Sequence, residues 1–123
     1  MEESKKERLS GSLAALAGAG GIEGAAVITR DGLLIVSNLA DNVDAETFAA
    51  MSAAMMGAAE TAVSELGKEA PERVVIESRR TKLLCAGAGK EAILVVVARP
   101  DTNLGLVLVS LKKTAAKIEA ELE

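Results

Sequence analysis

The stretch TFAAMSAAMMGAA, Thr47 to Ala59, carries no charge in a chain in which 26% of the residues are charged. Asp44 precedes it and suits a helix N-cap, and Gly67 follows it and suits a stop, so we predict a long helix over 44–66. At 100° per residue, one face of this helix carries an apolar stripe that we expect to lie in the core. The stripe consists of Phe48, Met51, Met55, Ala59, Ala62, Val63 and Leu66.

The opposite face of this helix carries only small residues. These are Ala50, Ala53, Ala54, Gly57 and Thr61. A solvated face normally carries Lys, Glu or Arg, and a helix that is apolar all round is usually covered on both sides. Gly57 costs about 1 kcal/mol relative to alanine within a helix, and close approach of another protein element would offset this. We therefore interpret the small face as an interface; the alternative is that alanine is a good helix former that tolerates exposure.

Composition limits the class of protein. The 123 residues are 50% hydrophobic with one aromatic, which predicts one domain over 1–123 with an aliphatic core. We expect residues 1–8 to be frayed or extended. The net charge of −4 and the lack of aromatic residues argue against nucleic-acid binding. A single cysteine, a charged start and no apolar run of membrane-spanning length predict a cytoplasmic protein that does not insert into membranes.

The rest of the chain predicts further helices and strands around the long helix. A first helix is expected over 3–17, and a last helix is expected to begin after Thr102 or Asn103. The strands are expected at 22–29, 33–38, 73–79, 81–86 and 92–98. The order α-β-β-α-β-β-β-α with two hairpins predicts a five-stranded, mainly antiparallel sheet in a three-layer α+β sandwich. The polar strand 73–79 fits a sheet edge, and the apolar strand 92–98 fits the centre.

The side chains that most catalytic and metal sites need are missing. The chain has no histidine, the commonest general base and metal ligand. Cys85 has no imidazole partner, and we expect it to be a buried, inert thiol. The sequence GAGK at 87–90 resembles the end of a phosphate-binding loop, but Leu84 and Glu91 occupy positions that this motif needs as glycine and Ser or Thr. We therefore expect no enzyme, no cofactor and no metal, but an interaction module.

Three segments, in order, resemble the Roadblock (dynein light chain type) family, most closely its small stand-alone prokaryotic members. They are GIEGAAVITRDGLLIVSN at 21–38, the Ala/Met-rich helix, and ILVVVARPDTNLGLVLVSLKK at 93–113. The most telling matches are Gly24, the Asp31–Gly32 turn and Asn103-Leu104-Gly105 at the start of the last helix. The resemblance covers roughly residues 9 to 122.

This resemblance implies a homodimer in which the edge strand after the long helix pairs with its twin. The two long helices then lie side by side on one face, and the first and last helices cover the other. Such domains commonly act on a small Ras-like GTPase, as activators or scaffolds, without binding the nucleotide. On this basis we expect the dimer interface at Ala50, Ala54, Ala58, Thr61, Val75 and Glu77. We expect partner binding at Ala53, Met56, Gly57 and Glu60. The sequence leaves open which side of the long helix faces the twin.

Two other functions fit the same pattern. One is a structural adaptor without a GTPase partner, and the other is a small-molecule sensor with a cleft between helix and sheet. A GTPase regulator could also insert an arginine into its partner, and Arg30 at the tip of the first hairpin is the candidate for such a finger. The alternative is that Arg30 is a plain turn residue, and we favour contact through the helix.

Overall fold

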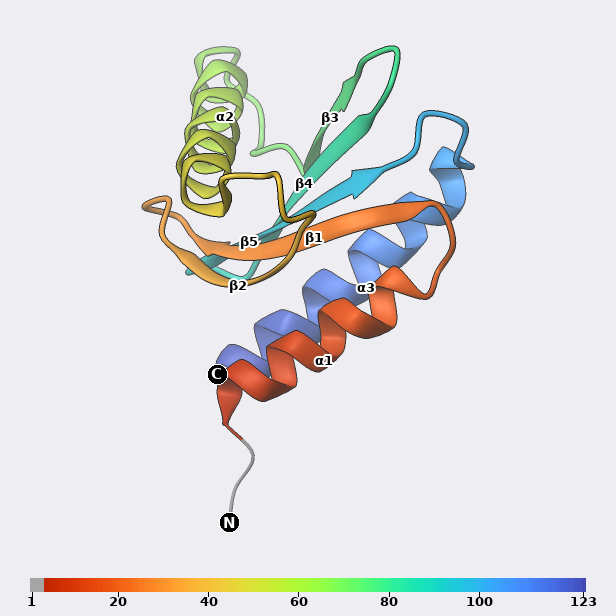
Figure 1. Cartoon of the computed structure of the whole chain (residues 1–123). Coiled ribbons are helices and arrows are strands. Elements are labelled where there is room, and N and C mark those ends of the chain that lie inside the picture. Colours follow the sequence, from red (N-terminus) through yellow and green to blue (C-terminus); the bar gives the residue numbers. More distant parts are fainter. Residues whose placement is uncertain (1–3) are drawn as a thin grey trace.

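A computed structural model describes residues 4–123, which form three helices and one five-stranded sheet (Figure 1). The helices are α1 (Lys5–Ala17), α2 (Ala45–Glu65) and α3 (Leu104–Leu122). The strands are β1 (Ile22–Thr29), β2 (Leu34–Asn38), β3 (Arg73–Glu77), β4 (Lys82–Ala88) and β5 (Ala92–Ala98). Their order along the chain is the predicted one.

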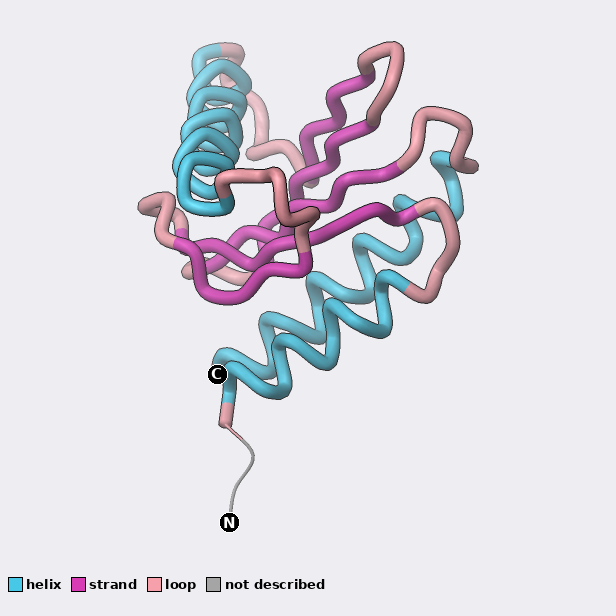
Figure 2. The backbone as a smooth tube through the Cα atoms, in the orientation of Figure 1, coloured by secondary structure: helices cyan, strands magenta, loops and turns pink. Residues whose placement is uncertain are grey.

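The sheet has the order β2-β1-β5-β4-β3, and each neighbouring pair is antiparallel. The apolar strand β5 lies at the centre and the polar strand β3 at an edge, as the sequence predicted. Figure 2 shows the three layers, with α2 on one face of the sheet and α1 and α3 on the other. The predicted sandwich, with the long helix alone on its face, is confirmed.

Two hydrophobic cores fill the spaces between the layers, because successive side chains of a strand point to opposite faces. On β5, Leu94 and Val96 belong to the core under α1 and α3. Ile93 and Val95 belong to the core under α2. The run AILVVVA is therefore apolar throughout because both of its faces are covered by helices.

The ends of several elements differ from the prediction. Helix α1 begins at Lys5, because the Ser4 hydroxyl accepts a hydrogen bond from the Glu7 backbone N–H at 3.1 Å in a capping box. The expected fraying or extension of residues 1–8 stays a prediction, since the structure gives the helix from Lys5 and residues 1–3 lie outside the described part. Strand β4 runs on through Ala88, although we expected it to end at residue 86 and give way to a hairpin turn over 87–90. Only Gly89 of the predicted turn, with φ of +79°, takes a left-handed conformation.

The caps of α2 are those that the sequence predicted. The Asp44 carboxylate accepts a hydrogen bond from the Thr47 backbone N–H at 3.2 Å. Beyond the other end of the helix, Gly67 has a positive φ of +70°. Gly32, in the predicted turn between β1 and β2, lies directly against the helix. A Cβ on Gly32 would be 3.1 Å from the Ala50 Cα, so the missing side chain allows the hairpin to meet α2.

Candidate interaction surface

Helix α2 packs on the sheet through its smaller residues. Ala49, Ser52, Ala53 and Met56 are buried beneath it. Three of these four side chains are short, which allows the helix to approach the sheet closely. The close approach that we inferred for the small face is therefore made in part by the chain's own sheet. Ala53 and Met56, predicted to bind a partner, are core residues, and Met56 is only 1% exposed.

The predicted core stripe of α2 is rotated out of the core. Met51 is 61% exposed and Leu66 is 73% exposed, so the prediction that they are buried is wrong. Phe48 and Met55 are half-buried at the margin of the core under α2. The reason is that the small residues took the position against the sheet and displaced the longer side chains sideways. We call Phe48, Met51, Met55, Ala62 and Leu66 the methionine flank.

The other exposed side of α2 carries only short side chains between Ala50 and Thr61. We call it the small flank: Ala50, Ala54, Gly57, Ala58 and Thr61, all of them exposed. A Cβ added at Gly57 would meet no described atom within 4 Å beyond its chain neighbours and the backbone of its own helix turn. The structure therefore supplies no internal reason for glycine there. The small flank is accessible, and its predicted contact with a twin stays a prediction.

Arg30 joins three segments of the chain. Its Nη1 lies 2.8 Å from the Glu60 Oε2 of α2, and its Nη2 donates to the Gly89 carbonyl oxygen at 3.1 Å. The guanidinium lies over Gly87, where a Cβ would be 2.7 Å from Nη2. Arg30 thus ties the β1–β2 turn to α2 and to the β4–β5 turn. We call these contacts the Arg30 clamp.

The clamp changes the interpretation of two candidate residues. Glu60, predicted to contact a partner, binds within the chain and is half-buried. Arg30 would have to give up both of its contacts to reach into a GTPase. Sequence reasoning missed this pair because thirty residues separate the two partners, and only the folded chain brings them together.

The outer edge of β3 is the margin of the sheet. Val74 and Ile76 pair with Cys85 and Leu83 of β4, so they share the face that α2 covers. Val75 pairs with Leu84 and faces the layer of α1 and α3. Ile76 is 41% exposed although it is apolar. The edge thus presents apolar side chains on both of its faces.

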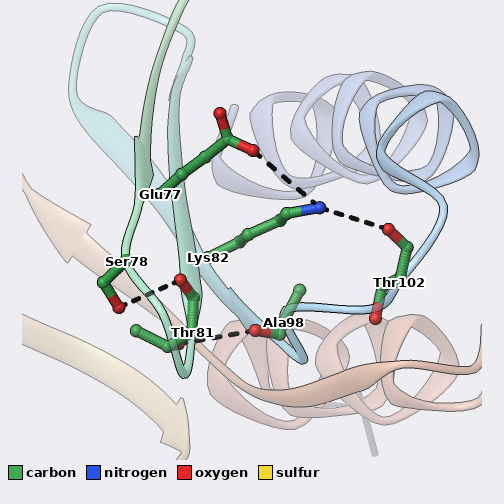
Figure 3. A network of polar contacts seen from close by, with 6 residues as sticks. All are labelled: Glu77, Ser78, Thr81, Lys82, Ala98 and Thr102. Atoms are coloured by element: carbon green, nitrogen blue, oxygen red, sulfur yellow. Dashed lines mark hydrogen bonds and ion pairs between the residues drawn. The ribbon is translucent and has the colours of Figure 1, made fainter.

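Polar contacts anchor the β3–β4 hairpin (Figure 3). The Lys82 Nζ lies 3.9 Å from the Glu77 Oε1 and donates to the Thr102 carbonyl oxygen at 3.4 Å. The Ser78 hydroxyl donates to the Thr81 carbonyl at 3.3 Å, and the Thr81 hydroxyl donates to the Ala98 carbonyl at 3.4 Å. These bonds join the hairpin tip to β5 and to the loop before α3. They hold the edge strand in a defined position.

Beyond these surfaces, the described residues include one cysteine and scattered acidic side chains. Cys85 is fully buried, and this burial raises the pKa of its thiol to about 12. Within residues 4–123, no three His, Cys, Asp or Glu side chains gather where they could hold a metal ion. The same part of the chain has no helix that is long and apolar enough to cross a membrane. What the geometry offers is exposed apolar side chains on α2 and on the edge strand β3.

Comparison with known proteins agrees with this architecture. The sequence pattern of the Roadblock/LC7 domain matches residues 12–98. The uncharacterized protein MJ0714 of Methanocaldococcus jannaschii is 45% identical over 100 residues, which cover 81% of this chain and 84% of that protein.

Solved structures share the fold over almost the whole chain. MglB of Myxococcus xanthus has a TM-score of 0.90 at 21% identity, covering 99% of this chain and 92% of that one. The gliding protein MglB from Thermus thermophilus has a TM-score of 0.87 at 22% identity, covering 98% and 93%. At these identities the likeness is one of fold. Together with the pattern match and the archaeal relative, it leads to one conclusion: the chain belongs to the Roadblock/LC7 family.

Proposed function

We propose that this protein is a homodimer that binds a small Ras-like GTPase and regulates or scaffolds it by contact. Membership of the Roadblock/LC7 family supports this function. The observation that carries it is the exposed apolar flank of α2 on the same face of the sheet as the apolar side of a free edge strand. An apolar patch of this kind on a domain with a complete core marks a protein–protein contact.

The twin covers the methionine flank and the edge of β3. Phe48 and Met55 of α2 border the same core cluster as Val74 and Leu83 of the β3–β4 hairpin. Met51 and Leu66 on this flank and Ile76 on the edge strand are exposed apolar side chains. We therefore place the α2 part of the dimer interface on the methionine flank. Val75 and Glu77 remain in the interface, as the sequence analysis proposed.

The small flank is then left for the GTPase. Ala54, Gly57 and Ala58 give it a flat surface on which a second protein can come close to the helix backbone. The GTPase is regulated by ordering of its switch loops, since the chain has no phosphate-binding loop and Arg30 is held by its own clamp. In this proposal the protein contributes a contact surface, and the catalytic groups for GTP hydrolysis are those of the GTPase.

A matched set of variants tests both surfaces. Met51→Lys places a charge on the methionine flank and should give a monomer by light scattering at micromolar concentration. Gly57→Arg places a charge on the small flank, away from Met51, and should leave the dimer mass unchanged. It should abolish capture of the GTPase from the native cytosol and any change in its rate of GTP hydrolysis. Lys68→Glu, beyond the end of α2, is a control for an unrelated change in surface charge.

Two results would overturn the proposal. A wild-type protein that stays monomeric at high concentration would exclude the homodimer. A dimer that captures only a protein without GTP hydrolysis would exclude the GTPase and leave a structural adaptor.

A further inference from the structure

The edge strand β3 is chemically complementary to itself. Its sequence Arg73-Val74-Val75-Ile76-Glu77 has a base at one end, an acid at the other and apolar residues between them. A twofold axis through Val75 turns the strand end for end. It brings each Arg73 opposite Glu77 of the other copy, and each Val74 opposite Ile76 of the other copy. Each basic side chain then lies opposite an acidic one, and each apolar side chain lies opposite another apolar one.

The residues of β3 whose backbone N–H and C=O groups point away from β4 are those that this pairing needs. The Ser78 N–H donates to the Thr81 carbonyl at 2.9 Å, so the backbone groups of residue 78 point inward to β4. Because the direction alternates along an antiparallel strand, the groups of 73, 75 and 77 point outward. Those three residues carry the free donors and acceptors of the edge. Two copies can therefore pair only where an outward residue meets an outward residue.

The family resemblance implies that β3 pairs with β3 of a second copy, and we propose that this antiparallel pairing takes the register centred on Val75, with Arg73 of each copy paired to Glu77 of the other. This register rests on the proposed homodimer and adds its geometry. Arg73, Val75 and Glu77 all project from the face that α1 and α3 cover, so the charged side chains meet on one side of the joined sheet.

Two neighbouring registers are less favourable. Centring the pair on Val74 sets Arg73 opposite Val75 and leaves Glu77 beyond the ladder. Centring it on Ile76 sets Glu77 opposite Val75 and moves Arg73 past the end of the other strand. Each of them shortens the ladder and leaves a charge unpaired, while the Val75 register uses all five residues.

The two charged side chains are free to take new partners. Arg73 is 3.3 Å from the Glu72 carboxylate, which is itself 86% exposed. Glu77 is 61% exposed and lies 3.9 Å from Lys82. Such exposed pairs contribute little to folding, so exchanging them for contacts across the dimer costs little.

Cysteine cross-linking identifies the register directly. In the Val75 register, the Val75→Cys variant places two thiols opposite each other, within the Cα separation of about 4.4–6.8 Å that a disulfide accepts. It should form a covalent dimer on mild oxidation. Val74→Cys alone and Ile76→Cys alone should not, because each is then diagonal to its own copy at about 7–8 Å. A mixture of these two variants should cross-link. The natural Cys85 is fully buried and serves as the unreactive background.

A charge exchange tests the Arg73–Glu77 pair. Arg73→Glu should raise the dimer dissociation constant about tenfold, because the symmetry converts two attractive pairs into two repulsive ones. The double variant Arg73→Glu/Glu77→Arg should recover most of that loss. Arg79→Glu, beyond the strand, should leave the dissociation constant unchanged. Circular dichroism confirms that each variant folds.

The outcomes test the register and the existence of the homodimer separately. Self-linking through position 74 or 76 would show another register, and a dimer that links at none of the three positions would show that β3 is not paired. Failure of the double variant to recover would refute the charge pair. In contrast, a monomeric wild type would refute the homodimer of the proposed function.

Discussion

Removal of the Arg30 side chain should loosen α2 and both neighbouring turns at once. In the Arg30→Ala variant, the Glu60 carboxylate loses its contact at 2.8 Å and the Gly89 carbonyl loses its donor at 3.1 Å. Both acceptors then depend on water. The C-terminal half of α2, which carries Gly57, Ala58 and Thr61 of the small flank, then loses this tie to the two turns.

The size of the effect follows from the exposure of the pair. A hydrogen bond to a charged group contributes about 1.5–3 kcal/mol when buried, whereas an exposed ion pair contributes about 0.2–1 kcal/mol. Both side chains of the Arg30–Glu60 pair are 32% exposed, so the ion pair belongs near the lower range. Adding the partly buried bond to Gly89, we expect Arg30→Ala to lower the free energy of unfolding by about 1–2 kcal/mol.

Urea denaturation of matched variants measures this loss. A double-mutant cycle of Arg30→Ala and Glu60→Ala should give a coupling energy of about 0.5–1 kcal/mol. The Arg30→Lys variant keeps the charge but not the forked geometry, so we expect intermediate stability. A change below about 0.5 kcal/mol for Arg30→Ala would refute the clamp, since surface substitutions without a partner fall in that range.

Gly87 provides an independent test of the same contact. An added Cβ there lies 2.7 Å from the Arg30 Nη2, and the next atom outside the Arg30 side chain, the Gly89 carbonyl oxygen, is 3.8 Å away. Gly87→Ala should therefore destabilise the wild type by about 1 kcal/mol, because it displaces the guanidinium. In the Arg30→Ala background the same change should be nearly neutral. Equal costs in the two backgrounds would show that Gly87 is required for some other reason.

The functional assay distinguishes a clamp from a finger. If Arg30 acts through α2, then Glu60→Ala should impair GTPase regulation about as much as Arg30→Ala. If Arg30 enters the active site of the GTPase, only its own removal should abolish stimulation.

Three further predictions concern stability, reactivity and pH. Met56→Ala should lower the free energy of unfolding by about 2–5 kcal/mol in urea denaturation, because Met56 is 1% exposed; Met51→Ala, at 61% exposure, should change that of the monomer by less than about 0.5 kcal/mol. The Cys85 thiol, with a pKa raised to about 12 by burial, should resist iodoacetamide at about pH 8 in the native protein and react quickly in urea; fast native reaction would contradict its burial. The backbone N–H of Thr47 lowers the pKa of Asp44 below its ordinary 3.8, so Asp44 stabilises the fold above that value and loses this effect as the pH falls through the lowered pKa; Asp44→Asn should remove this part of the acid dependence in thermal melts, and an unchanged acid dependence would contradict it.

The strands were predictable because their patterns are local. The alternation in β3 and the uniform apolar run of β5 each specify a position in the sheet, and both predictions were confirmed. The Asp31–Gly32 turn and the caps of α2 were predictable for the same reason. Turns and caps depend on a few neighbouring residues, and their chemistry is visible in the sequence.

The orientation of α2 was not predictable from its pattern. Periodicity identifies a buried face only where a polar face opposes it, and α2 has an apolar stripe on one side and small residues on the other. Which of them meets the sheet depends on how closely the helix approaches. That distance depends on Gly32, far away in the sequence, and on the short side chains of Ala49 and Ala53. The Arg30 clamp was hidden for a similar reason, because its acceptors come from α2 and from the β4–β5 turn.

The exposed methionine flank and the close packing of α2 have a single cause. A helix that packs alanine and serine against its own sheet leaves longer apolar side chains, Met51 and Leu66, exposed. Loss of those side chains removes little from the core, so binding through this flank can change with little effect on folding. Met56, on the same helix, is buried in the core, so its loss should weaken the fold. Separation of binding from stability on one helix is what an interaction domain requires, since its partner surface can then vary while the sheet beneath it stays the same.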